Sequence, residues 1–246
     1  MTNGRVLVVG GASGIGEAAA MLMRERGWRV CVTDVDANAL IRLTASAVDI
    51  VGVEMDVTDP DDVGRAISEA VSLLGGMDSL VVCAGISDAA PTSDTPPDRW
   101  KRLLDVNLNG GYYTIREALP ALHQSSRASV VMTSSIAAQL GLPRRASYCA
   151  SKGAVEALVR SLAVEFAPQV RFNAVAPGYV STRLVAQAIE QGRVEAQQII
   201  GSIPLQRMAT PREIAECIAF LASESSGFVT GQVLVADGGM TVNATW

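Results

Sequence analysis

The chain has 246 residues, of which 49% are hydrophobic and 18% are charged, and its formal net charge is −5. This length and composition suit one large α/β domain with a sizeable core, and the negative charge without a basic cluster argues against a nucleic-acid partner. No apolar run reaches the ~18 residues that indicate a membrane span, and residues 1–5 lead straight into a strand-like run without a signal peptide. We therefore expect a cytoplasmic protein with no membrane partner.

The cysteines and the single histidine argue against two classes of site. Cys31, Cys83, Cys149 and Cys217 are scattered without C-x-x-C spacing, so we expect reduced thiols rather than a metal site or a disulfide framework. His123 stands in a polar stretch at an expected helix end, and we interpret it as a surface residue. A Ser-His-Asp hydrolase mechanism needs a buried catalytic histidine and is therefore excluded.

Strand-like and helix-like segments alternate along the whole chain. Short β-branched runs predict seven strands, at residues 5–10, 29–33, 50–55, 79–83, 129–133, 170–176 and 232–235. Helical patterns occupy residues 17–26, 37–46, 59–74, 98–122 and 148–166, a weaker one lies near 183–200, and a last helix starts at 211. The alternation predicts an α/β fold, with one parallel sheet and helices on both faces.

Glycine, acidic and hydroxyl residues follow the predicted strands directly. Because ligands of such sheets bind beyond the carboxyl ends of the strands, residues far apart in sequence should meet along one edge. The strand-end residues are Gly10, Asp34, Asp56, Gly85, Ser135, Pro177 and Gly178.

A glycine-rich loop joins the first strand to the first helix. Gly10, Gly14 and Gly16 let the backbone approach a phosphate at a helix N-terminus. Ser13 and Ile15, on either side of Gly14, are expected to bind the cofactor as well. The spacing differs from the G-x-G-x-x-G of the dinucleotide fingerprint. A dinucleotide site is the favoured interpretation, and a simple tight turn is the alternative.

Asp34 ends the second predicted strand, 18 residues after Gly16. A carboxylate there accepts both ribose hydroxyls of adenosine and repels a 2′-phosphate, so we expect NAD rather than NADP. The alternative role of Asp34 is a helix N-cap. Asp56 and Val57, after the third strand, are expected at the adenine edge, although Asp56 could equally be a turn aspartate.

Tyr148 and Lys152 are four residues apart at the start of a predicted helix, so they share one face. A tyrosine has a pKa near ~10, and a neighbouring cation lowers it. The pair can thus act as an acid and base. The alternative is that Tyr148 packs in the core and Lys152 is a solvated surface charge.

An ordered set of residues resembles the short-chain dehydrogenase/reductase family over nearly the whole chain. The resemblance implies one Rossmann-like domain over residues 1–246 with a seven-stranded sheet, a substrate lid at about 180–210, and NAD(P)-dependent oxidoreduction. The set is Gly10, Gly14, Gly16, Asp34, Asp56, Ala84, Gly85, Asn107, Ser135, Tyr148, Lys152, Pro177 and Gly178.

The resemblance also implies a role for each catalytic residue. Ser135, which lies 13 residues before Tyr148, is the expected catalytic serine, and Ser134 should face away. Tyr148 is the expected acid/base, and Lys152 lowers its pKa and binds the nicotinamide ribose. Asn107 kinks its helix and anchors a proton-relay water.

Further positions flank the cofactor in this family. Pro177, Gly178, Val180 and Thr182 are expected beside the nicotinamide, and Ala84 and Gly85 at the cofactor edge. Two departures stand out, because Val9 replaces a threonine and Cys83 replaces an asparagine amide; as an apolar pair they could compensate each other. Cys149, next to Tyr148, is interpreted as a buried structural cysteine.

The expected function is hydride transfer between NAD and a small secondary alcohol, cyclic or apolar, with a diol included. Apolar residues of the lid, such as Leu184, Ile189 and Ile199, suit that substrate but could equally pack the lid itself. The alternatives are a 3-oxoacyl-[acyl-carrier-protein] reductase, which needs NADP and a basic surface, and a non-catalytic NAD-binding scaffold. The resemblance implies a homotetramer, with a dimer second, built on the helices at 98–122 and 148–166.

Overall fold

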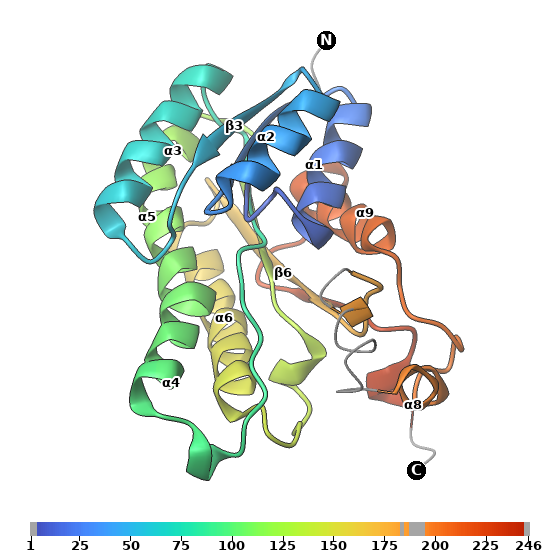
Figure 1. Cartoon of the computed structure of the whole chain (residues 1–246). Coiled ribbons are helices and arrows are strands. Elements are labelled where there is room, and N and C mark those ends of the chain that lie inside the picture. Colours follow the sequence, from blue (N-terminus) through green and yellow to red (C-terminus); the bar gives the residue numbers. More distant parts are fainter. Residues whose placement is uncertain (1–3, 183–184, 187–194, 244–246) are drawn as a thin grey trace.

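The computed structural model describes residues 4–182, 185–186 and 195–243, which form a seven-stranded parallel sheet with helices on both faces (Figure 1). The order across the sheet is β3-β2-β1-β4-β5-β6-β7. Every predicted strand is present, with each boundary within one residue of the prediction, and the predicted fold class is confirmed. The strands are β1 (Arg5–Val9), β2 (Arg29–Asp34), β3 (Ile50–Glu54), β4 (Ser79–Val82), β5 (Ser129–Thr133), β6 (Arg171–Pro177) and β7 (Val233–Ala236).

The helices divide between the two faces of the sheet (Figure 1). The two faces bury separate apolar clusters because alternate side chains of a strand point to opposite sides; in β1, Leu7 and Val9 join one cluster, and Val6 and Val8 join the other. One face carries α3 (Pro60–Leu74), α5 (Gly110–Leu122) and α6 (Ala146–Glu165), and the other carries α1 (Gly14–Glu25), α2 (Ala37–Ser46) and α9 (Pro211–Ala222). None of the helices among the described residues is long and apolar enough to cross a membrane.

The predicted helix over residues 98–122 is present, but it is not α-helical throughout. The segment consists of α4 (Pro97–Leu104), a π-helical turn at Asp105–Asn109, and α5. A π-helical turn widens the helix and often occurs at functional sites. It contains Asn107, so the departure from α-helical geometry that was expected at this residue is present.

The predicted lid is only partly described. Residues 183–184 and 187–194, with Leu184 and Ile189, lie outside the described residues, and so does most of the predicted helical pattern near 183–200. Within the described part, α8 covers Ala196–Gly201, and Val180 forms an isolated parallel bridge with Ala209. The bridge brings the two ends of the 180–210 segment together beyond the end of β6.

Candidate active site

A cleft of about 1180 Å³ lies along the carboxyl edge of the sheet. The strand order reverses between β1 and β4, which places residues from both halves of the sheet around one crevice. Of the predicted site residues, only Asn107 lies outside its lining. The residues brought together are Gly10, Ser13, Gly14, Ile15, Gly16, Asp34, Asp56, Val57, Ala84, Gly85, Ser135, Tyr148, Lys152, Pro177, Gly178, Val180 and Thr182.

The glycine loop has no room for a side chain at Gly10 or Gly16. Gly10 has φ +69°, and a Cβ there would lie 2.5 Å from the main-chain nitrogen of Ala84. A Cβ on Gly16 would lie 2.1 Å from the main-chain oxygen of Gly10. Ser13 precedes α1 as its N-cap, but its side chain makes no capping hydrogen bond. The first N–H groups of α1 therefore face the cleft as a site for phosphate.

Asp34 lies half-buried beside this loop. Its Oδ2 accepts a hydrogen bond of 3.0 Å from the Ala12 N–H, and its Oδ1 accepts one of 3.1 Å from the Asp36 N–H. The N-cap of α2 is Asp36, which accepts from the Ala39 N–H, so the alternative interpretation of Asp34 as the cap is wrong. Each carboxylate oxygen has further acceptor capacity, which suits a pair of ribose hydroxyls.

Asp56 and Val57 follow β3, the neighbour of β2, so they lie at the same end of the cleft as Asp34 and make mainly local contacts there. The Asp56 carboxylate accepts hydrogen bonds from the N–H and hydroxyl of Thr58, at 2.9 and 2.8 Å. Val57 packs where Gly110 begins α5, since a Cβ on Gly110 would lie 2.7 Å from Cβ of Val57. Asp56 is thus a turn aspartate, the alternative left open by the sequence, and it lines the cleft as well.

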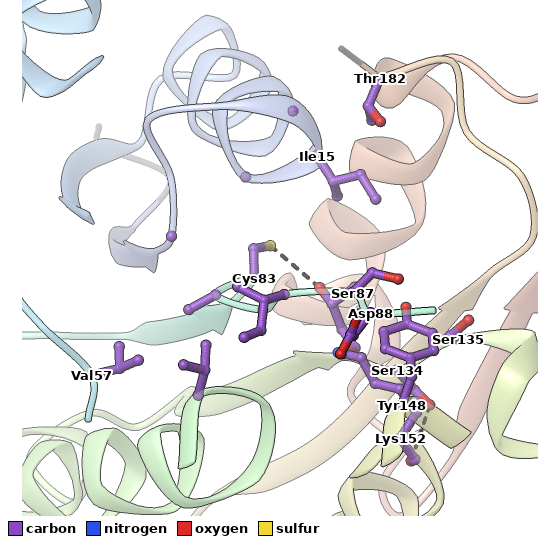
Figure 2. Close-up of a pocket in the computed structure, with 18 of the residues that line it drawn as sticks. Ile15, Val57, Cys83, Ser87, Asp88, Ser134, Ser135, Tyr148, Lys152 and Thr182 are labelled. Carbon is purple, nitrogen blue, oxygen red and sulfur yellow. Dashed lines mark hydrogen bonds between the residues drawn. The ribbon is translucent and has the colours of Figure 1, made fainter. Parts of the chain in front are cut away.

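Tyr148 and Lys152 share one face of α6, as their spacing predicts. Nζ of Lys152 lies 5.9 Å from the centroid of the Tyr148 ring (Figure 2). Lys152 is only 4% exposed and donates a 2.8 Å hydrogen bond to the main-chain oxygen of Thr133. The alternative of a solvated surface lysine is therefore wrong. Burial lowers the pKa of Lys152 to about 8, and the Cys83 thiol acts weakly in the other direction.

The expected lowering of the Tyr148 pKa is not what the chain itself produces. Burial raises the pKa of Tyr148, and a hydrogen bond with Ser135 and the charge of Arg145 oppose this effect only in part. Lys152 is not among the groups that lower the pKa of Tyr148, although its own pKa of about 8 leaves it largely charged at neutral pH. The polypeptide thus keeps Tyr148 in the protonated state at neutral pH.

The two neighbouring serines point in different directions. Ser134 is buried, and although the residue lines the cleft, its hydroxyl donates a 3.0 Å hydrogen bond to the carboxylate of Glu156. The side chain of Ser135 forms a hydrogen bond with that of Tyr148, and its hydroxyl also accepts a hydrogen bond of 3.2 Å from the Ala137 N–H. The hydroxyl of Ser134 is thus directed to Glu156, in the sense predicted, but the residue itself still lines the cleft. Ser135 is the serine that meets the tyrosine (Figure 2).

Asn107 lies behind the cleft and holds one of its walls. Its Oδ1 accepts from the Ile86 N–H at 2.7 Å, and its Nδ2 donates to the Ile86 carbonyl oxygen at 2.9 Å. Nδ2 also donates to Ser151 at 3.1 Å, and the Ser151 hydroxyl donates to the carbonyl oxygen of Tyr148 at 2.8 Å. The sequence interpretation missed Ser151, although its position three residues after Tyr148 places both on one side of α6.

The two departures from the family pattern do not compensate each other as an apolar pair. Val9 joins the cluster on the α3 and α5 face, whereas Cys83 packs against the cluster on the opposite face. Instead the Thr133 hydroxyl donates to Sγ of Cys83 at 3.3 Å. Cys149 is half-buried rather than buried, and its thiol contacts the Leu140 carbonyl oxygen at 3.8 Å, outside the cleft.

The beginning of the 180–210 segment reaches the glycine loop. A Cβ on Gly14 would lie 3.7 Å from Cγ2 of Thr182, and a Cβ on Gly178 would lie 2.9 Å from Asp237. Pro177, Gly178, Val180 and Thr182 thus line the same cleft as Ala84 and Gly85, where the resemblance expects the nicotinamide; Figure 2 shows Thr182 beside Ile15.

Comparison with known proteins decides the family. The family model described as enoyl-(acyl carrier protein) reductase matches residues 10–241. A crystal structure of a short-chain dehydrogenase/reductase from Brucella melitensis superposes with a TM-score of 0.92 at 34% identity, covering 98% of this chain and 97% of the other. This chain belongs to the short-chain dehydrogenase/reductase family. The resemblance drawn from its ordered motifs is confirmed at this level.

Several short-chain dehydrogenases of this family are similar over their full length. Cis-4-hydroxycyclohexanecarboxylate dehydrogenase of Sinomonas cyclohexanicum is 39% identical, covering 96% of this chain and 95% of the relative. Cyclohexanol dehydrogenase of Acinetobacter sp. is 32% identical, with coverage of 96% and 94%. A 3-oxoacyl-[acyl-carrier-protein] reductase of Thermotoga maritima is 34% identical, with coverage of 96% and 97%.

One solved short-chain dehydrogenase/reductase structure carries a nucleotide. ElxO with NADP bound superposes with a TM-score of 0.92 at 32% identity, covering 98% of this chain and all of that chain. The family relationship thus supports an oxidoreductase that acts on CH–OH groups with a nicotinamide cofactor.

Proposed function

We propose that this protein is an NAD-dependent oxidoreductase of a small secondary alcohol, cyclic or apolar, with a diol included. The observation that carries the proposal is one continuous cleft. It has the glycine loop and Asp34 at one end and Ser135, Tyr148 and Lys152 at the other. Two relatives whose names refer to cyclohexane alcohols support a ring-shaped substrate.

The residues present fit a nicotinamide dinucleotide. The tight glycine loop at Gly10 and Gly16 and the uncapped start of α1 would hold its diphosphate. Asp34 would accept the adenosine ribose hydroxyls. A bound nicotinamide accepts the substrate hydride in oxidation and returns it in reduction.

The chain's own residues handle the substrate oxygen and its proton. In this proposal the hydroxyls of Ser135 and Tyr148 hold the substrate oxygen, and Ser135 stabilises the charge that develops on it. Because burial keeps Tyr148 protonated, its hydroxyl donates a proton to a carbonyl oxygen in reduction. In oxidation the phenolate accepts the alcohol proton, and Lys152 helps to hold that charge. The proposed role of Asn107 is to fix Ile86 and anchor the relay water.

Asp34 supports NAD over NADP. A carboxylate in a half-buried position repels the additional 2′-phosphate of NADP. The lining residues next to it, Thr33 and Val35, are uncharged. The similar structure ElxO has NADP bound. The preference of this chain for NAD is therefore proposed from Asp34 and not from the structural neighbours.

A 3-oxoacyl-[acyl-carrier-protein] reductase is the second candidate. The Thermotoga maritima relative favours it, and the description of the family model refers to a reductase of another acyl-carrier-protein substrate. An acidic carrier protein requires a basic docking surface, whereas this chain has a net charge of −5. Asp34 opposes the NADP that such a reductase needs.

We also propose a cytoplasmic homotetramer. The four cysteines are free, which suits a reducing compartment. Trp100 on α4 and Tyr112 on α5 are 38% and 46% exposed, and such aromatic side chains are enriched at protein interfaces. Light scattering coupled to size exclusion will give four subunits if the proposal is right, and two or one if it is wrong.

The activity experiment compares wild type with Tyr148→Phe. Both are incubated with cyclohexanol, a cyclohexanediol and a linear secondary alcohol, in the presence of NAD or NADP. We expect wild type to reduce NAD with a cyclic alcohol, and Tyr148→Phe to lose at least about 100-fold in kcat. Cys149→Ser, one residue away and outside the cleft, is the matched control that retains turnover. Near-normal turnover by Tyr148→Phe, or faster reaction of 3-oxoacyl thioesters with NADPH, would refute the proposal.

A further inference from the structure

Arg145 brings a positive charge to the catalytic end of the cleft. It precedes α6 as its N-cap residue, and its carbonyl oxygen accepts from the Cys149 N–H at 2.9 Å. Residues three apart at a helix start lie on one side, so Arg145 and Tyr148 face the same space. Both line the cleft, and the Arg145 charge acts on the Tyr148 hydroxyl.

This charge has no carboxylate partner within the described part of the chain. There the Arg145 side chain makes one hydrogen bond, from Nη1 to the hydroxyl of Ser87 at 2.6 Å. A guanidinium has five N–H donors, so most of them remain available to a ligand. Two other basic residues of the lining are paired, Arg99 with Asp88 and Lys101 with Asp105.

Two remaining charged groups require separate consideration. Asp88, next to Ser87, accepts from both Arg99 and the Ala89 N–H, so its charge is already compensated. Arg102 also lines the cleft, but it is exposed on α4, whereas Arg145 is half-buried beside the catalytic tyrosine. Among the described residues of the lining, Arg145 is therefore the half-buried guanidinium without a carboxylate partner.

The position of Arg145 is fixed from the opposite wall. Asn107 clamps both main-chain polar groups of Ile86, and Ser87 follows directly. The Ala90 N–H donates to the carbonyl oxygen of Arg144 at 2.9 Å, which ties the 86–90 loop to the start of α6. Figure 2 draws Ser87 with Ser135 and Tyr148 around the same pocket. A guanidinium held in this way is preorganised for a ligand.

We infer that Arg145 binds an oxyanion group of the substrate, so that the preferred substrate is a hydroxy acid whose carboxylate or sulfonate lies across a ring or short chain from the carbinol. A guanidinium binds such a group through two parallel N–H donors. Apolar lining residues, among them Ile136 and Leu142, suit the carbon frame between the two ends. This inference rests on the proposed oxidoreductase function and names its substrate class.

The test compares acid and neutral forms of one substrate. Oxidation of 4-hydroxycyclohexanecarboxylate, 4-hydroxycyclohexanesulfonate and 4-hydroxycyclohexanecarboxamide is followed with wild type, Arg145→Gln, Arg145→Lys and Arg144→Gln. We expect wild type to prefer an anionic form over the amide by about 10- to 100-fold in kcat/KM. Arg145→Gln should remove that preference, and Arg145→Lys should restore part of it. The two acids distinguish carboxylate from sulfonate recognition.

Arg144→Gln is the matched control, because it removes the same charge one residue away and outside the cleft. It should keep the acid preference. An equal loss in Arg144→Gln and Arg145→Gln would overturn the inference, because it would indicate a general charge effect. So would a wild type that oxidises the amide as well as the acids, while the proposed oxidoreductase function would stand.

A binding measurement separates failure of this inference from failure of the proposed function. Cyclohexanecarboxylate and cyclohexanecarboxamide are titrated into each variant in the presence of NADH by calorimetry. Tighter carboxylate binding that disappears in Arg145→Gln supports the inference even without turnover. Equal binding of the two compounds to wild type overturns it.

Discussion

Nζ of Lys152 donates a 2.8 Å hydrogen bond to the main-chain oxygen of Thr133, which joins the second turn of α6 to the end of β5. Lys152 also lies beneath the Ala84–Gly85 loop, since a Cβ on Gly85 would lie 3.6 Å from Nζ. Its ammonium is thus enclosed by sheet, helix and loop. This burial disfavours the charged form of Lys152 and lowers its pKa.

Lys152→Met is expected to stabilise the fold and abolish turnover. Burial lowers the pKa of Lys152 from 10.5 to about 8. Between these pH values the unfolded state binds a proton that the folded state does not, so the destabilisation grows as the pH falls and is complete below about pH 8. Removing the ammonium should raise the free energy of unfolding at pH 7 by roughly 2 kcal/mol, after subtracting the lost hydrogen bond. The gain should shrink between pH 8 and 10.5. Urea unfolding at pH 7 and pH 10 measures it, and a destabilised variant at pH 7 would contradict this account.

The pH dependence of the two reaction directions should reflect a protonated Tyr148. Burial raises the pKa of Tyr148 above 10, so kcat/KM for ketone reduction should be flat at neutral pH and fall in alkali. Oxidation should accelerate towards alkaline pH over the same range. Arg145→Gln should move both profiles to higher pH, because the charge of Arg145 lowers this pKa. An oxidation profile that reaches its plateau near neutral pH would contradict this prediction and would support the lowered pKa of Tyr148 expected from the sequence.

The fold was predictable because its determinants are local. Each of the strands β1 to β6 is a short, mainly apolar run that ends at, or is soon followed by, a glycine, an acidic residue or a hydroxyl that lines the cleft. The same rule placed Gly10, Asp34 and Ser135 together before any contact was known. The apolar periodicity of residues 98–122 did not predict the π-helical turn at Asp105–Asn109, because one wider turn hardly changes the spacing of apolar residues. Only the family resemblance indicated a kink at Asn107.

The parts of the site that were missed depend on tertiary contacts. Ser151 and Arg145 are ordinary polar residues in sequence, and only the folded chain brings them to Asn107 and Ser87. The pKa of Tyr148 was mispredicted for the same reason. Spacing identifies a nearby cation, but the burial of Tyr148 itself, which only the folded chain shows, decides the direction of its pKa shift.

Asp34→Asn tests the nucleotide preference while keeping most of the local structure. An asparagine oxygen can still accept from the Ala12 N–H, so the variant mainly loses the negative charge. We expect wild type to bind NADH more tightly than NADPH, and the ratio of the two dissociation constants to fall by about 10-fold or more in the variant. Fluorescence titration with both nucleotides measures the ratio.

Asp36→Asn is the matched control for this prediction. It removes the same charge two residues away, and asparagine is as good an N-cap as aspartate for α2. Its nucleotide preference should equal that of wild type. A wild type that prefers NADPH would show that the interpretation of Asp34 is wrong and would favour the 3-oxoacyl reductase.

Asp78→Asn should remove an acid-sensitive part of the stability. Burial acts to raise the pKa of Asp78, but hydrogen bonds from Arg5 and Ser125 outweigh it and hold the pKa at about 2. Because this folded pKa lies below the usual 3.8, the carboxylate stabilises the fold above pH 3.8, and that contribution is lost as the pH falls through about 2. The free energy of unfolding of the variant should be about 2 kcal/mol lower at pH 7.

The matched control for Asp78 is Asp49→Asn, whose carboxylate pairs with Arg24 on the exposed surface. Surface ion pairs contribute little, so this variant should remain close to wild type. Urea unfolding between pH 7 and pH 2.5 measures all three proteins. A constant difference between wild type and Asp78→Asn over that range would contradict the assigned pKa.

Gly16→Ala should destroy nucleotide binding because the loop cannot accommodate a methyl group. A Cβ at Gly16 would lie 2.1 Å from the main-chain oxygen of Gly10, and backbone, unlike the end of a flexible side chain, cannot move aside locally. The turn must open, so the N–H groups at the start of α1 lose their alignment toward the diphosphate. Gly141→Ala is the matched control, because a Cβ there meets nothing within 4 Å. We expect NADH affinity to fall by at least about 10-fold for Gly16→Ala, which corresponds to ~1.4 kcal/mol, and to be unchanged for Gly141→Ala. Circular dichroism of the folded variants separates this local effect from unfolding, and normal NADH binding by a folded Gly16→Ala would show that the loop does not hold the nucleotide.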